Sequence, residues 1–200
     1  MAAPVALARC SRLGAVTGAV WLLGMSVPLV GVHAQELPPP AYQLAAQQAG
    51  VPSPVLYAVA LQESGAKLRG RLIPWPWTLN VAGQSERYAT RAEACAGLRS
   101  ALVRAPASRI DAGLGQVNLG YQSRRYSAPC DLLDPYRNLA IAADILREQH
   151  APGEDWLLAI GRYHRPAGGV AAARYRRSVH QHLTRVLGPG VPLSSMSPLP

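Results

Sequence analysis

Glu63 is the residue of this chain best suited to acid–base chemistry. It continues an apolar stripe with helical spacing that consists of Leu56, Val59 and Ala60. A carboxyl group in line with a buried stripe loses hydration, and the negative end of the helix dipole lies close to it, so we expect its pKa to be raised. Such a group still holds a proton near neutral pH and can act as a general acid. The alternative is a glutamate at a helix end that turns into solvent.

Three other short segments follow the one that contains Glu63. The four, in order, are Glu63-Ser64, Gly113-Leu114-Gly115-Gln116, Asn138-Leu139 and Ala159-Ile160-Gly161-Arg162-Tyr163-His164. Their order and spacing resemble the lytic transglycosylases of the soluble-lytic-transglycosylase (SLT) type, over residues 41–187. Residues 75–83 and 161–164 are similar to a narrower group, encoded beside conjugation, type IV secretion or pilus machinery and in integrating conjugative elements.

The resemblance implies a lysozyme-like fold and a reaction on peptidoglycan, without a cofactor or a metal. Glu63 would protonate the glycosidic oxygen between N-acetylmuramic acid and N-acetylglucosamine. It would then take the proton of the muramoyl 6-hydroxyl, which closes a 1,6-anhydro ring. The sugar supplies the nucleophile, so one carboxylate suffices, whereas the usual glycoside hydrolase needs two. Asp111 is the best candidate for a second carboxylate, although it could simply fix the nearby turn.

The resemblance also assigns four polar residues to the substrate site. Ser64 matches a serine that helps position the acid, and Gln116 matches a glutamine that binds the glycan near the cleaved bond. Asn118 would extend that contact, although both amides could instead satisfy the backbone of the turn. Tyr163 is expected to point inward with its hydroxyl bonded to Glu63 or to the substrate; a core tyrosine bonded to backbone is the alternative.

Two positions depart from the family pattern. Gly115 stands where many relatives have Met, so one apolar wall of the sugar site is expected to be missing. His164 stands where the broader family has Asn, and histidine is ordinary there in the conjugation-associated group.

The elements that must position these residues are mostly helices. Ser53 is suited to cap the helix that carries Glu63, with Pro54 in its first position and Gly65 at its end. Further helices are expected over residues 41–49, from a Thr90–Glu93 capping box to about 103, after Asp134, after Asp155, and from Gly168-Gly169 to 187.

One small β element is expected near residues 72–83, because alternating Pro and Trp break the helical period there. Trp75 and Trp77 could stack on sugar rings or cover the core. Residues 113–118 are expected to form a turn that leads into a short helix. The fold class is therefore mainly α (α+β).

The first 34 residues have the features of a secretory signal. Arg9 and Arg12 precede an uncharged run that ends at Ala34, a residue suited to signal cleavage, which predicts export to the periplasm. An uncleaved membrane anchor is the alternative. A Pro-rich leader is expected over residues 35–40 and a Pro- and Ser-rich flexible tail over residues 188–200.

Two cysteines remain after the signal, Cys95 and Cys130. In an oxidising compartment they have only one possible pairing, and we predict a disulfide. On the chain-entropy model, closing this loop would contribute roughly 3–4 kcal/mol. Two unpaired buried thiols are the alternative.

The charge of the chain limits the classes of partner. Without residues 1–34 the formal net charge is +7, almost all of it arginine, which suits an acidic polymer such as cell-wall glycan, anionic lipid or nucleic acid. His180 and His182 are two apart on a helix and make a poor metal pair. Export argues against a nucleic-acid partner for the arginines of the last helix, which are Arg174, Arg176, Arg177 and Arg185.

The sequence therefore predicts an exported lytic transglycosylase that acts on peptidoglycan glycan strands and serves a conjugation, type IV secretion or pilus machinery. Two alternatives stay open. One is a non-catalytic peptidoglycan-binding scaffold on the same fold, and the other is a lysozyme-type muramidase that hydrolyses the same bond.

Overall fold

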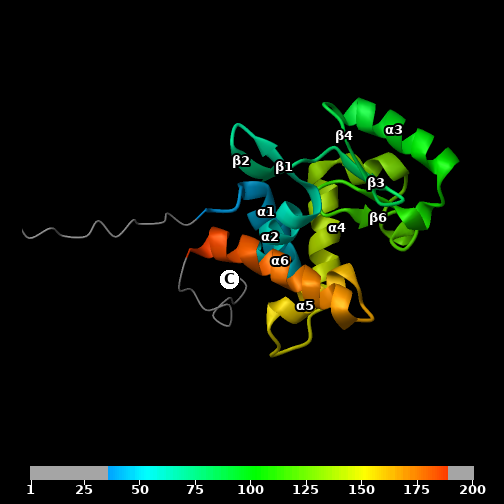
Figure 1. Ribbon diagram of the computed structural model, residues 1–200. Helices are drawn as coiled ribbons and strands as arrows, with labels where there is room; N and C mark the ends of the chain where they lie inside the picture. The colour runs from blue at the N-terminus through cyan, green and yellow to red at the C-terminus, as the bar shows by residue number, and fades with distance from the viewer. Residues whose placement is uncertain (1–35, 189–200) are drawn as a thin grey trace, which may run out of the picture. The chain divides into compact units, whose positions relative to one another are not determined.

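The computed structural model describes residues 36–188, and all of its elements belong to the unit His33–Pro200. The described part is mainly helical, with short antiparallel strands (Figure 1). Its α-helices are α1 (Pro40–Ala49), α2 (Ser53–Ser64), α3 (Arg91–Arg104), α4 (Pro135–Glu148), α5 (Trp156–His164) and α6 (Gly169–Leu187). Short 3-10 helices are η1 (Ala107–Arg109), η2 (Ser123–Arg125) and η3 (Pro129–Leu133). The proposed signal and residues 189–200 of the proposed tail lie outside the described residues.

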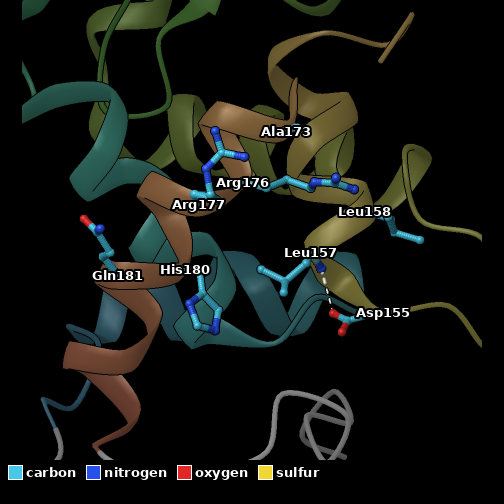
Figure 2. A pocket seen from close by; sticks show the side chains of 8 residues that line it. All are labelled: Asp155, Leu157, Leu158, Ala173, Arg176, Arg177, His180 and Gln181. Atoms are coloured by element: carbon cyan, nitrogen blue, oxygen red, sulfur yellow. Dashed lines mark hydrogen bonds between the residues drawn. The ribbon is translucent and has the colours of Figure 1, made fainter. Parts of the chain in front are cut away.

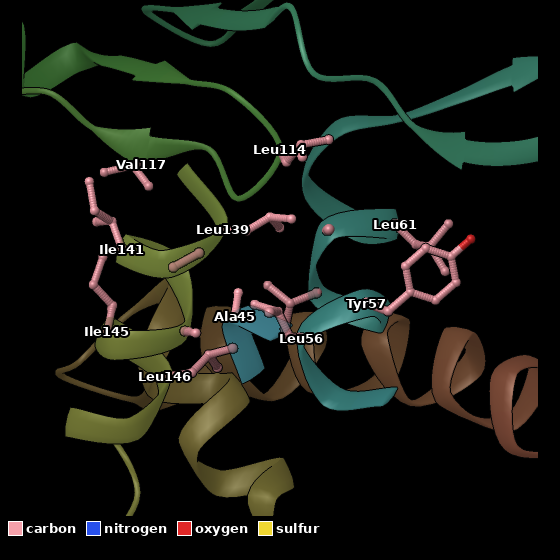
Figure 3. Packing of buried hydrophobic residues seen from close by; sticks show 14 of the residues in the cluster. Ala45, Leu56, Tyr57, Leu61, Leu114, Val117, Leu139, Ile141, Ile145 and Leu146 are labelled. Carbon is pink, nitrogen blue, oxygen red and sulfur yellow. The ribbon is translucent and has the colours of Figure 1, made fainter. Parts of the chain in front are cut away.

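Helix α2 is the centre of the core. Every residue from Val55 to Leu61 is buried, because α1, α4, α5 and α6 all contact this helix. Figure 3 shows Leu56 directed toward α4, while Tyr57 and Leu61 point to the opposite side. The expected stripe of Leu56, Val59 and Ala60 is buried, and the residues of the helix between them are buried as well.

Where a side-chain cap was predicted, the helix start agrees with the prediction in all but one case. Thr90 and Glu93 form the predicted capping box of α3, and Asp134 and Asp155 cap α4 and α5 with their carboxylates. The exception is α2, where the cap position is Pro52 and Ser53 already belongs to the helix. The difference is one residue, because proline at either position suits a first turn.

The β structure is larger than the single element expected near residues 72–83. β1 (Gly65–Leu68) pairs with β2 (Arg71–Pro74), and a second antiparallel sheet has the order β4-β3-β5-β6. Its strands are β3 (Thr78–Val81), β4 (Gln84–Arg87), β5 (Ile110–Ala112) and β6 (Val117–Asn118). The turn at residues 113–116 thus leads into a strand, and the expected short helix after it was wrong. Asp111 pairs with Asn118 across β5 and β6.

One of the two tryptophans of this region, Trp77, covers the core. Trp75 donates its indole N–H to the carbonyl of Tyr88 at 2.7 Å, and Trp77 packs edge-on against Trp75 and against the core cluster. Both lie in the segment between β2 and β3.

A disulfide and a set of polar contacts join parts of the described fold that are far apart in sequence. Cys95 of α3 and Cys130 of η3 form the predicted disulfide, with Cα atoms 5.4 Å apart. Glu36, in the predicted leader, accepts one hydrogen bond from Tyr57 and pairs with Arg185 at 3.1 Å, so this part of the leader is attached to α2 and α6. Among residues 36–188, no helix combines the length and the apolar character needed to cross a bilayer.

Candidate active site

A polar cavity of about 380 Å³ lies where the end of α2 meets β5, β6 and the end of α5. The side chains that can do chemistry in its wall are those of Glu63, Asp111, Gln116, Tyr163 and His164. Four segments far apart in the sequence thus converge on one hollow. Three of the residues predicted for the site, Glu63, Gln116 and Tyr163, are among them.

Glu63 is the acid of this cavity. Burial raises the pKa of its carboxyl to about 7, a hydrogen bond from Tyr175 opposes that rise, and the negative charge of Asp111 adds to it. Desolvation outweighs the hydrogen bond, so the protonated and ionised forms are both populated near neutral pH. The raised pKa agrees with the prediction from the apolar surroundings of Glu63.

Tyr175 of α6 holds this carboxyl group. Its hydroxyl donates to Oε1 of Glu63 at 2.5 Å, and within residues 36–188 the other oxygen, Oε2, has no hydrogen-bond partner. One oxygen is therefore fixed while the other is left to exchange a proton.

Sequence reasoning missed Tyr175, although a signal was present. The residue begins an apolar stripe on α6 that continues with Val179, Leu183 and Val186, all of them buried. A tyrosine in such a stripe needs a partner for its hydroxyl. The pattern could have shown that need, but not that the partner lies 112 residues earlier in the chain.

Gln116 occupies a tight turn beside Glu63. Its backbone has a positive φ of 46°, and its side-chain amide donates to the carbonyls of Gly113 at 2.8 Å and Thr78 at 3.1 Å. The amide nitrogen therefore satisfies the turn, as the alternative interpretation held. Within the described part of the chain the side-chain oxygen accepts no hydrogen bond, so it remains able to accept one from a ligand in the cavity.

Asn118 is bonded within the fold, as the alternative interpretation of its role held. Its amide group donates to Asp111 at 2.8 Å and to the carbonyl of Ser108, and its oxygen accepts the N–H groups of Gly120 and Tyr121. All of its polar atoms are thus engaged within the protein, although the residue borders the cavity.

Ser64, predicted to help position the acid, is fully buried and does not border the cavity. Its hydroxyl lies 2.8 Å from the carbonyl oxygen of Leu114 and 3.0 Å from that of Ala60. These contacts join the end of α2 to the turn that carries Gln116. Ser64 therefore fixes the relative positions of Glu63 and Gln116.

Asn138 completes this junction from α4. Its side chain is buried, accepts the N–H of Gly115 at 2.7 Å and donates to the carbonyls of Ala112 and Leu132. The Asn138-Leu139 segment, both residues of which are buried, therefore has a structural role.

Tyr163 borders the cavity, but its hydroxyl donates to the backbone carbonyl of Gly115 at 2.6 Å and not to Glu63. The backbone-bonded alternative is the correct one. Gly115 is itself buried, and a Cβ added to it would lie 2.6 Å from the Cβ of Ala142 and 2.9 Å from the hydroxyl of Tyr163. The expected gap in an apolar wall was therefore wrong, because Ala142 and Tyr163 already fill that space.

Asp111 and His164 complete the polar wall. Burial raises the pKa of Asp111, whereas burial and the nearby Arg165 lower the pKa of His164 despite the charge of Asp111. The imidazole stacks face to face on the ring of Tyr175, with centroids 4.5 Å apart. A second carboxylate thus shares the cavity with Glu63.

A larger cavity of about 630 Å³ lies between α5 and α6 (Figure 2). Its side chains do not form an acid–base arrangement like the one around Glu63. Leu157 and Leu158 form its apolar part, with Arg176, Arg177 and His180 along α6. Its carboxylate, Asp155, accepts the N–H of Leu157 as the cap of α5. No group of this cavity has the combination of acid and donor found around Glu63.

Within residues 36–188, no three His, Cys, Asp or Glu side chains gather closely enough to hold a metal ion. Comparisons of the chain with models of protein families, with curated protein sequences and with solved structures give no significant match.

Proposed function

We propose that this chain is an exported peptidoglycan lytic transglycosylase with a lysozyme-like fold. The observation that carries the proposal is Glu63, a carboxyl with a pKa of about 7 in a polar cavity, held at one oxygen by Tyr175. The order of the four segments, the mainly helical fold and the small antiparallel sheets beside the cavity support it.

In the proposed reaction Glu63 acts twice. Its protonated form gives a proton to the glycosidic oxygen, the bond from that oxygen to C1 of N-acetylmuramic acid breaks, and the electron pair leaves with N-acetylglucosamine. The ionised Glu63 then removes the proton of the 6-hydroxyl, whose oxygen bonds to C1. The acid is regenerated and no water is consumed. A pKa near 7 suits both steps, because neither form is strongly disfavoured.

The presence of Asp111 in the same cavity as Glu63 favours a second candidate function, that of a lysozyme-type muramidase. Two carboxyl groups on one cavity are the arrangement that glycoside hydrolases use, one as acid and one as base or nucleophile. The amide of Asn118 donates to one oxygen of Asp111, so this carboxylate is at least partly engaged in the turn. We therefore rank hydrolysis second, and a non-catalytic scaffold third.

Digestion of purified peptidoglycan, with mass spectrometry of the fragments, distinguishes the three. Fragments with 1,6-anhydromuramoyl ends that fall at least roughly 100-fold in Glu63→Gln, but less than roughly tenfold in Asp111→Asn, support the transglycosylase. Reducing ends that disappear in both variants support the muramidase. Binding of peptidoglycan without release of fragments supports the scaffold.

We also propose that the protein acts in the periplasm and opens the wall locally for a conjugation, type IV secretion or pilus machinery. This rests on the export signal of the sequence and on the likeness of residues 75–83 and 161–164 to the conjugation-associated group.

A further inference from the structure

Tyr121 is an exposed aromatic residue at the edge of the cavity that contains Glu63. Its side chain is 78 % exposed, although it borders the same hollow as Glu63, Asp111 and Gln116. Ligand cavities combine a few polar groups with aromatic faces, and an exposed aromatic ring beside catalytic groups is more informative than one on open surface.

The backbone that carries Tyr121 is held firmly. Oδ1 of Asn118 accepts the N–H groups of Gly120 and Tyr121, both at 3.0 Å, and the amide of Asn118 is itself tied to Ser108 and Asp111. Gly120 lies so close to Ser108 that an added Cβ would come within 2.6 Å of its backbone nitrogen. The start of the loop is therefore packed directly against η1.

The loop that carries Tyr121 is also fixed by the residues that follow Tyr121. Gln122 accepts a hydrogen bond from Arg125, which forms a two-oxygen ion pair with Glu148 of α4. Tyr126 donates to the carbonyl of Leu119 at 2.7 Å. The polar groups of the loop thus bond to one another and to α4, while the ring of Tyr121 is left uncovered.

We propose that Tyr121 is a stacking platform for a pyranose ring of the glycan strand. A β-1,4-linked amino sugar carries its hydroxyl and amide groups around the ring edge and axial C–H groups on its faces. These C–H groups are attracted to the negative face of an aromatic ring. Since the loop is already ordered, the contact costs little conformational entropy on binding.

The stacking proposal rests on the proposed function. Its test measures binding separately from cleavage. In the Glu63→Gln background, the dissociation constant for a hexamer of β-1,4-linked N-acetylglucosamine is measured by calorimetry. Tyr121→Ala is expected to weaken binding roughly tenfold, as truncation of an aromatic anchor does, whereas Tyr121→Phe keeps the ring and stays within roughly twofold. The matched control is Tyr136→Ala, since Tyr136 is 66 % exposed on α4 and does not border the cavity.

In the active protein, Tyr121→Ala is expected to raise KM for peptidoglycan roughly tenfold with kcat within roughly twofold, because the contact is equal in ground and transition states. If the unaltered protein releases fragments and Tyr121→Ala leaves both KM and the hexamer affinity unchanged, the platform is overturned and the proposed function stands. If the unaltered protein neither binds the hexamer nor releases fragments, both are overturned.

Discussion

At the residue scale, Glu63 makes the stability of the folded protein depend on pH. Its pKa is raised from 4.5 to about 7, chiefly by desolvation, so the native state binds its proton more tightly than the unfolded chain does. Stability is therefore fully retained below pH 4.5 and is lost as pH rises toward 7, where the folded protein carries a buried negative charge. We expect Glu63→Gln to unfold like the parent at pH 4 and to be more stable by up to about 3 kcal/mol at pH 8.

Urea unfolding at the two pH values measures this difference. The control is Asp144→Asn, which alters an exposed carboxylate on α4. A stability gain in Glu63→Gln that is the same at pH 4 and pH 8 would contradict the raised pKa.

Tyr175 is expected to tune the acid as well as to hold it. Its hydrogen bond favours the ionised carboxylate, so Tyr175→Phe should raise the pKa of Glu63 further. The activity of the proposed transglycosylase requires the protonated form first, so the alkaline limb of kcat/KM should move to higher pH in this variant. We also expect kcat to fall roughly tenfold through looser positioning of the carboxyl. An unchanged pH profile, measured by fragment release, would exclude Tyr175 as a partner of the acid.

The sequence alone predicts Glu63 as the acid but does not predict that Tyr175 holds it, for a physical reason. The expectation of a raised pKa for Glu63 came from the apolar residues of its own helix, which are neighbours in sequence. The hydrogen bond to Tyr175 spans 112 residues, and whether Tyr163 or Tyr175 reaches Glu63 depends on how α5 and α6 pack on α2. No local pattern encodes that choice, and sequence reasoning selected the wrong tyrosine.

At the element scale, Gly115 allows α4 and α5 to approach the turn that carries Gln116. We expect Gly115→Ala to destabilise the protein by about 1–3 kcal/mol, because the new methyl group would overlap Ala142 and the hydroxyl of Tyr163. Activity should fall with it, since Tyr163 can no longer reach the Gly115 carbonyl.

A double-mutant cycle with Ala142→Gly checks this reason for the loss. Chemical denaturation of the single and double variants should show that Ala142→Gly costs about 1 kcal/mol alone but recovers part of the loss when Gly115→Ala is present. Strictly additive losses would show that Gly115 is needed for something other than this close approach.

The elements that the sequence predicts well are those that depend on contacts between residues close together in the chain. The starts of α3, α4 and α5 depend on Thr90, Asp134 and Asp155, each of which bonds to backbone two or three residues away. The strands β5 and β6 have only three and two residues and exist because they pair with segments elsewhere, so they leave no periodicity to detect.

At the scale of the whole molecule, the Cys95–Cys130 bridge encloses half of the residues that line the cavity in one covalent loop. The 35-residue separation contains β5, the turn with Gln116, β6 and the loop with Tyr121. Within this loop, β5 and β6 have only three and two residues. The bridge thus limits the freedom of these short strands and of the turns beside them.

Removing the bridge should therefore lower stability much more than it lowers activity in the folded state. On the chain-entropy model a loop of this length contributes about 4 kcal/mol, so the double variant Cys95→Ala, Cys130→Ala should unfold at a clearly lower urea concentration. Neither cysteine borders the cavity, so the kcat measured well below the melting temperature should stay within about threefold of the parent. Dithiothreitol should reproduce the loss in the parent and have no effect on the double variant. An unfolding midpoint that neither treatment moves would mean that the packing of α3 on η3, and not the bridge, closes the loop.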